Sequence, residues 1–243
     1  MSEVAGAVDA AAIVAQLRAM RAAIAHAAVA AGRDADSVTL VAVSKGHGPD
    51  AVRAAYADGQ RTFGESYARE LQDKAAALAD LPDLQWHFIG HLQRNKMAAV
   101  APLAAVVHSL DSLRGIEAFE RCVAAIGPHA RREVLLQVNV GADPAKSGCT
   151  PSELPVLVDR LFASPRLRWR GLMTLPPLNV DPAPIFNALA ALRDRERARV
   201  GAGPGVGDGL SMGMSDDAPA AIAAGATWVR VGTAIFGARV APG

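Results

Sequence analysis

The stretch SVTLVAVSKGHGPDAVRAAYAD, residues 37–58, shows the pattern on which the fold assignment depends. Its first part, 37–44, is β-branched and almost wholly apolar, as expected for a strand that is covered on both faces. Its last part, 49–58, begins with proline, a residue that is well tolerated in the first turn of a helix. The stretch therefore predicts one β-strand followed by one α-helix.

The same alternation continues along the rest of the chain. Further strand-like runs cover residues 61–64, 85–90, 105–110, 133–139, 167–175, 209–213 and 228–236. Helical patterns cover residues 9–31, 66–79, 93–101, 113–126, 152–163, 183–200 and 216–224, so every strand but the last is followed by a helix. Strict alternation favours a parallel sheet. Eight such units predict an α/β fold, a (β/α)8 TIM barrel with an extra N-terminal helix, in which residues 1–243 form a single domain. An open doubly wound sheet is the alternative.

The composition excludes several classes of protein. Of 243 residues, 51% are hydrophobic and 20% are charged, so the chain can bury a core and is not intrinsically disordered. A formal net charge of +1 lacks the basic footprint of a nucleic-acid-binding or membrane-surface protein. No apolar run approaches the ~18–20 residues of a transmembrane helix, and the first residues lack the basic region of a secretory signal. The two cysteines are too few for a disulfide framework, and no metal-binding motif is present. We therefore expect a cytoplasmic protein with no nucleic-acid, membrane or metal partner.

Lys45 is the first candidate for chemistry. It follows a dry strand at its carboxyl end, where the active sites of barrel enzymes form. Partial desolvation lowers the pKa of an amine and makes it a nucleophile for carbonyl groups. Lys45 is therefore a candidate Schiff-base lysine, and a surface lysine at a strand end is the alternative.

Two loops near the end of the chain suggest a phosphate site. LSMGMSDD (210–217) and VRVGTAIFG (229–237) place small residues and hydroxyls after the seventh and eighth strands. This is the usual phosphate site of barrel enzymes. Gly213 and Gly232 let the backbone approach a ligand closely, and helix starts supply N–H donors. Ordinary turn and capping chemistry explains the same residues equally well.

Arg230 and His87 are candidates because they lie on apolar strands. A buried arginine needs acceptors, and those of Arg230 are expected to be a carboxylate such as Glu65, at the end of the second strand, or a ligand. His87 lies between Trp86 and Phe88 on the third strand. It is either a site residue or a hydrogen-bonded core histidine.

Eight segments of the chain resemble, in the same order, motifs of the pyridoxal phosphate homeostasis proteins, a family also described as alanine-racemase N-terminal-domain-like. They are VAVSKG (41–46), FGESYARELQDK (63–74), WHFIGHLQRNK (86–96), VHSLDS (107–112), QVNVGADPAKSG (137–148), RGLMTL (170–175), SMGMSDD (211–217) and VRVGTAIFG (229–237). The resemblance runs from about residue 10 to residue 239. One departure is Ser66, where the family usually has asparagine.

The resemblance implies a barrel of PLP fold type III that binds pyridoxal 5′-phosphate (PLP). Lys45 matches the lysine that forms a covalent aldimine, and Arg230 matches the arginine that faces the pyridine nitrogen. Ser211, Gly232 and Thr233 match positions that bind the phosphate, and Lys146 matches a second lysine near the site. With the candidates named above, the expected cofactor-binding residues are Lys45, Ser66, His87, Lys146, Ser211, Gly213, Arg230, Gly232 and Thr233.

The chemistry of such a site argues against turnover. A pyridine nitrogen that faces arginine stays unprotonated, so the ring is a poor electron sink for aminotransferase or decarboxylase chemistry. Racemases on the related fold add a β-domain and a tyrosine base. The two tyrosines here, Tyr56 and Tyr67, lie early in the chain on predicted helical stretches.

We therefore expect a protein without catalytic residues that holds PLP on Lys45, maintains intracellular PLP (vitamin B6) homeostasis, and passes PLP to apo-enzymes. An alanine-racemase-like enzyme is one alternative. A lysine-based aldolase, or another phosphate-ligand barrel without PLP, is another. A monomer is expected rather than a dimer.

Overall fold

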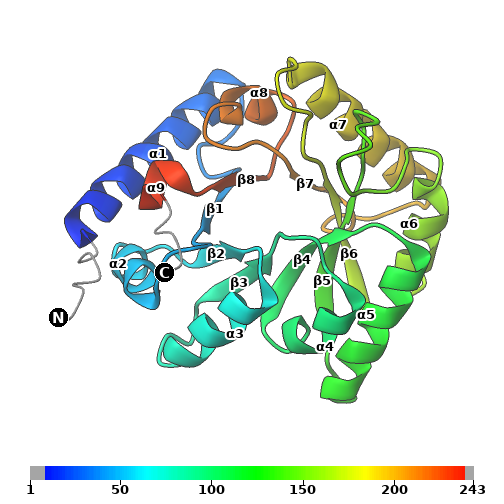
Figure 1. Ribbon diagram of the computed structural model, residues 1–243. Coiled ribbons are helices and arrows are strands. Elements are labelled where there is room, and N and C mark those ends of the chain that lie inside the picture. The colour runs from blue at the N-terminus through cyan, green and yellow to red at the C-terminus, as the bar shows by residue number, and fades with distance from the viewer. Residues whose placement is uncertain (1–8, 239–243) are drawn as a thin grey trace.

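Eight parallel strands close into a barrel within residues 9–238, the part of the chain that the computed structural model describes (Figure 1). The strands are β1 (Thr39–Val43), β2 (Thr62–Glu65), β3 (Gln85–Phe88), β4 (Ala104–Leu110), β5 (Arg132–Gln137), β6 (Leu167–Met173), β7 (Gly209–Ser211) and β8 (Trp228–Val231). Each strand pairs with the next, and β8 pairs with β1. The barrel prediction is confirmed, and the open doubly wound alternative is wrong. Residues 1–8 and 239–243 of the predicted domain lie outside the described residues.

The helices form a ring around the strands (Figure 1). They are α1 (Ala10–Ala30), α2 (Pro49–Ala57), α3 (Ala68–Ala77), the 3₁₀ turn η1 (Arg94–Lys96), α4 (Met97–Val100), α5 (Leu113–Ile126), α6 (Leu154–Phe162), α7 (Ala183–Arg199), α8 (Ala218–Ala223) and α9 (Thr233–Phe236). The last prediction differs from the structure: β8 ends at Val231, and residues 233–236 form α9. The eighth strand is therefore also followed by a helix.

The core has two layers. A small cluster fills the barrel interior and consists of Val41, Val106, Leu135, Met173 and Trp228. A larger cluster fills the space between strands and helices. Because side chains alternate along a strand, β1, β4, β5, β6 and β8 contribute apolar residues to both layers, which explains why their sequences are largely apolar.

Helix α1 is the extra element that the sequence predicts. Asp9 caps its first turn, and Gly32, with φ of +69°, follows its end. By length and composition α1 could cross a membrane, which the sequence analysis did not expect. In the structure its face that carries Leu17 packs against the barrel's outer layer.

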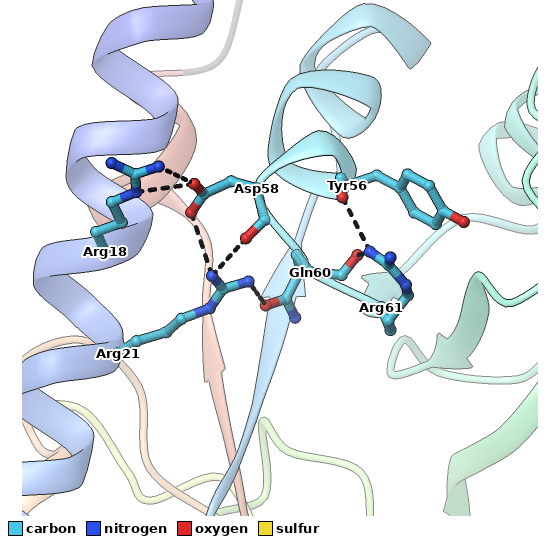
Figure 2. A network of polar contacts seen from close by, with 6 residues as sticks. All are labelled: Arg18, Arg21, Tyr56, Asp58, Gln60 and Arg61. Carbon is cyan, nitrogen blue, oxygen red and sulfur yellow. Dashed lines mark hydrogen bonds and ion pairs between the residues drawn. The ribbon is translucent and has the colours of Figure 1, made fainter.

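Polar contacts also hold α1 to the turn between α2 and β2 (Figure 2). Arg18 and Arg21 both form ion pairs with Asp58, and the second guanidinium nitrogen of Arg21 donates to Gln60 Oε1 at 3.0 Å. Gln60 Nε2 in turn donates to the backbone carbonyls of Leu40 and Thr62. The helix is thereby connected to strands β1 and β2.

Candidate functional site

The residues singled out in the sequence gather at the end of the barrel where the strands have their carboxyl termini. Lys45 follows β1, Lys146 lies in the loop after β5, and Thr233 follows β8. His87 and Arg230 lie on β3 and β8 themselves and are buried. Because active sites of parallel barrels form at this end, the arrangement supports a binding site here.

Lys45 is half-buried and lies in the turn after β1, two residues beyond Val43. Val41 belongs to the cluster inside the barrel, and strand alternation places Val43 on that same side. Ser66 lies nearby after β2, and its side chain makes no hydrogen bond within the described residues. The structure thus brings Lys45 to the mouth of the barrel, as the sequence predicts. Its reaction with a cofactor stays a prediction.

Glu65 does not pair with Arg230, which is a correction to the sequence analysis. It forms a salt bridge with Lys74 of α3, in which Oε1 lies 2.6 Å from Nζ. Glu65 is completely buried, and its other oxygen, Oε2, has no hydrogen-bond partner within the described residues. Burial raises the pKa of the Glu65 carboxyl group, although Lys74 acts in the opposite direction.

A chain of hydrogen bonds runs through the barrel interior from β3 to β8. His87 Nδ1 lies 2.9 Å from His108 Nε2, and His108 Nδ1 lies 2.8 Å from Ser211 Oγ. Arg230 Nη1 donates to Ser211 Oγ at 2.6 Å, and Nη2 donates to the carbonyl of Thr174 at 3.0 Å. The acceptors of Arg230 within the chain are therefore a hydroxyl and a backbone carbonyl. Its remaining N–H groups have no protein acceptor within the described residues.

His87 and His108, the two histidines in this series of hydrogen bonds, are neutral because they are buried. Desolvation lowers the pKa of His87 to about 3. The pKa of His108 is well below its usual value, through desolvation and through the nearby His87 and Arg230. Burial also lowers the pKa of Arg230 to about 10, so the guanidinium remains charged at neutral pH. Trp228 packs its ring edge-on against both imidazoles.

A cavity of about 610 Å³ opens between the loops that follow β6, β7 and β8. Its lining includes Ser215, Thr233 and residues 176–180, but not Ser211. Ser211 is completely buried and is hydrogen-bonded to Arg230 and His108. Ser211 therefore holds the Arg230 side chain in place, and Ser215 and Thr233 are the hydroxyl residues of the cavity lining.

Gly213 and Gly232 allow the loops around this cavity to pack closely. Gly213 has φ of +90°, and a Cβ there would lie 2.6 Å from the Cβ of Ala221. At Gly232 a Cβ would meet the carbonyl oxygen of Val43 at 3.1 Å. Both glycines therefore lie where a side chain would crowd neighbouring residues of the protein. The close approach to a ligand that the sequence analysis expects of them stays a prediction.

Lys146 closes one side of the site. Its Nζ donates a hydrogen bond to the carbonyl of Pro176, which belongs to the wall of the cavity. Asn139 shapes the loop that carries it, because Asn139 Nδ2 donates to the carbonyl of Asp143 at 2.8 Å. Lys146 thus lies at the edge of the same end of the barrel as Lys45.

Sequence reasoning missed Lys74, His108, Thr174 and Ser215. Strand alternation signals His108, since it lies two residues after the interior residue Val106. Ser215 lies just before a predicted helix, where a serine is ordinarily interpreted as a capping residue. For Lys74 the sequence offers no signal, because a lysine on a predicted amphipathic helix ordinarily faces solvent.

Comparison with known proteins identifies relatives over nearly the whole chain. The family described as "Alanine racemase, N-terminal domain" matches residues 8–240. A "Pyridoxal phosphate homeostasis protein" of Pseudomonas aeruginosa is 47% identical over 217 residues, which cover 89% of this chain and 91% of the relative. Its namesake in Escherichia coli K12 is 40% identical over 226 residues, or 89% of this chain and 92% of that protein.

Solved structures give the same result. PipY of Synechococcus elongatus, solved without PLP, is 36% identical, covers 93% of this chain and 100% of its own, and superposes with a TM-score of 0.82. Its structure with PLP bound has 34% identity, the same coverage and a TM-score of 0.79. Alanine racemase of Corynebacterium glutamicum, at 18% identity, covers 96% of this chain and 63% of its own with a TM-score of 0.67, and it supports the fold alone.

Proposed function

The chain belongs to the alanine racemase N-terminal domain family and, within it, to the pyridoxal phosphate homeostasis proteins, and we propose that it holds PLP on Lys45 without catalytic turnover. The observation that carries this proposal is the PLP-bound structure of PipY, a relative of the same fold that covers 93% of this chain. The described residues agree with it, because Lys45 follows β1 at the carboxyl end of the barrel, the same end at which Ser215 and Thr233 line a cavity.

The cavity between the loops that follow β6, β7 and β8 suits a phosphate group. Ser215 and Thr233 line it with hydroxyls. Thr233 and Ala234 open α9, so their N–H groups have no acceptor within that helix. Hydroxyl and N–H donors are the groups that hold a phosphate dianion. The proposed phosphate ligands are therefore Ser215, Gly232 and Thr233, and Ser211 acts indirectly through Arg230.

Arg230 suits the pyridine nitrogen. Its guanidinium is fixed by Ser211 and Thr174, and its remaining N–H groups lack a protein acceptor within the described residues. A guanidinium can only donate, so the ring nitrogen that it faces is held unprotonated. Such a ring withdraws electrons weakly, which favours storage of the cofactor over conversion of an amino acid.

Bound PLP supplies an aldehyde, and Lys45 supplies the primary amine that condenses with it. The condensation forms a C=N bond and releases one water, and hydrolysis reverses it. A reversible bond lets the protein limit free aldehyde and give PLP up to apo-enzymes, which we propose as its recipients. Racemisation of alanine is the second candidate function, because the matched family is described by alanine racemase.

We predict that Lys45 is the only residue that binds PLP covalently. Reduction of the PLP-loaded protein with borohydride should leave a phosphopyridoxyl group on the peptide that carries Lys45, as read by mass spectrometry. The Lys45→Ala variant should fold, because a change at a half-exposed position usually shifts stability by about 0.5 kcal/mol or less, and should lose the label. Lys146→Ala should keep it. Label on Lys146 alone would overturn the proposal.

A further inference from the structure

We propose that Lys74 is a positioning residue whose buried ammonium group fixes the turn that presents Lys45 to the cofactor. This inference rests on the proposed role of Lys45. Lys74 lies on α3, outside the barrel wall, and its side chain is only 6% exposed. Lysine is almost never buried unless it is paired, so the burial of Lys74 requires an explanation beyond ordinary surface chemistry.

The ammonium of Lys74 has as many acceptors as it has N–H groups. Nζ donates to the carbonyl oxygen of Ser44 at 2.7 Å, to Glu65 Oε1 at 2.6 Å and to Glu70 Oε2 at 3.2 Å. An ammonium group carries three N–H donors, so each has a partner. The three acceptors belong to β2, to α3 and to the residue that follows β1. The Lys74 ammonium group connects these three segments through its hydrogen bonds.

These contacts hold the peptide groups on both sides of Lys45. On one side, the Ser44 carbonyl accepts from Lys74, and the Ser44 hydroxyl donates to Glu65 Oε1 at 2.6 Å. On the other side, the N–H of Gly46 donates to Glu70 Oε2 at 2.8 Å, and Glu70 is itself held by Lys74. Gly46 has φ of +78°, which glycine adopts readily, and the N–H of His47 also donates to the Ser44 carbonyl at 3.0 Å.

The cluster acts through the backbone and not through the cofactor. Gly64, the neighbour of Glu65 on β2, faces the interior, because a Cβ there would lie 3.0 Å from Val41 Cγ1. Alternation then turns Glu65 outward, toward α3 and Lys74. The Lys74 side chain therefore lies on the helix-facing side of the barrel wall. It affects Lys45 by holding the backbone of the turn from which the Lys45 side chain extends.

The test compares Lys74→Met with Lys74→Met/Glu65→Leu, and uses Lys96→Met, at an exposed lysine, as the matched control. Lys74→Met leaves the buried Glu65 carboxylate without its cationic partner, with the Ser44 hydroxyl as its remaining donor, and is expected to unfold more easily. The double variant removes that unpaired carboxylate and is expected to recover thermal stability. Both should capture PLP on Lys45 ~10–10²-fold more slowly than wild type, because small misplacements of a reacting group cost that much. Capture is measured by stopped-flow absorbance and confirmed by borohydride trapping.

A double variant of wild-type stability that captures PLP at the wild-type rate would overturn the inference. If neither Lys74 variant folds, Glu70→Ala replaces them: it removes the acceptor of the Gly46 N–H, keeps the Lys74–Glu65 pair, and should slow capture similarly. Unchanged capture in Glu70→Ala would also overturn it.

Amide hydrogen exchange separates this inference from the proposed function. The Gly46 amide should exchange faster in Glu70→Ala and in the double variant, but not in Lys96→Met, whether or not PLP is present. If wild-type protein fails to take up PLP on Lys45, the proposed function fails, while faster Gly46 exchange in the variants still supports the role of Lys74 and Glu70 in fixing the turn. Unchanged Gly46 exchange in the variants overturns that role by itself.

Discussion

His87 and His108 are buried, and the loss of hydration disfavours their protonated forms. The folded-state pKa of His87, about 3, lies below the ordinary value of 6.5, and that of His108 is lowered in the same direction. Between these pH values the unfolded chain binds more protons than the folded chain. Stability is therefore fully present above about pH 6.5 and falls as the pH drops toward 3. Arg230, also charged at these pH values, adds to the penalty on His108.

We expect urea unfolding to show this loss between pH 6.5 and 5.5, before most carboxylates titrate. The slope of stability against pH should flatten in the variant His87→Phe/His108→Leu and persist in His129→Gln, at an exposed histidine. A double variant that keeps the full slope would show that other groups cause it. Because these histidines reach Arg230 through Ser211, the same variant should also weaken PLP binding.

Individual residues differ in how far the sequence reveals them. The place of Lys45 at the carboxyl end of the barrel can be predicted, since its position after an apolar strand is a local property of the sequence. The pairing of Glu65 with Lys74 cannot be predicted, because it depends on how α3 packs against the end of β2 in the folded barrel. Arg230 illustrates both cases: the sequence shows that a buried arginine needs acceptors, but not that Ser211 and Thr174 provide them.

At the scale of elements, strand and helix positions follow from periodicity, and their ends do not. Residues 233–236 continue the apolar run of β8, which made them look like strand, yet they form α9. The last pair between β8 and β1 is Val231 with Ala42, and Gly232, with φ of −116° and ψ of −80°, leaves the strand conformation before α9 begins. The helix predicted over residues 113–126 matches α5 at both ends, and the Ser112 side chain caps its first turn by accepting from the N–H of Gly115.

Two arginines of helix α1, Arg18 and Arg21, pair with Asp58 but differ in how much they should stabilise the position of the helix. Arg18 is 70% exposed on its side chain, so its ion pair is screened by water. Arg21 is more buried and also holds Gln60, which binds the backbone of β1 and β2 (Figure 2). Arg21→Met should lower the free energy of unfolding by about 1 kcal/mol, the typical value of a lost hydrogen bond. Arg18→Met should leave it unchanged in the same denaturant titration. Equal effects would contradict this ranking.

At the scale of the whole molecule, regular alternation of strands and helices fixed the barrel prediction, because a parallel sheet built from βα units closes when eight strands are present. The same property places the chemistry. Lys45, Lys146 and Thr233 are far apart in the chain and meet at one end because every parallel strand delivers its carboxyl terminus there. The chain order does not show how deeply each residue is buried: Ser211, a predicted phosphate ligand, is completely buried and hydrogen-bonded to Arg230 and His108, and its contact with a phosphate stays a prediction.

The arrangement of the whole barrel also bears on racemisation of alanine. That reaction needs a proton acceptor on each face of Cα, and Lys45 can serve only one face. Tyr56 is committed to Asp83, and Tyr67, which opens α3 beside the site, is 55% exposed. His87, the histidine that the sequence analysis considers as a site residue, is buried and hydrogen-bonded to His108. Neither tyrosine nor His87 is thus positioned as the second base.

We therefore predict that PLP-loaded protein forms no D-alanine from L-alanine above the level of the Lys45→Ala blank. Absence of one positioned base typically costs ~10²–10⁴-fold in rate, and the weak electron withdrawal of a ring that faces Arg230 slows proton removal further. Chiral chromatography of the amino acid measures the conversion. Steady turnover that disappears in Lys45→Ala would identify an enzyme, and its loss in Tyr67→Phe would then name the second base. Absence of turnover leaves reversible binding as the chemistry that a lone lysine, a hydroxyl-lined cavity and an unprotonated ring can perform together.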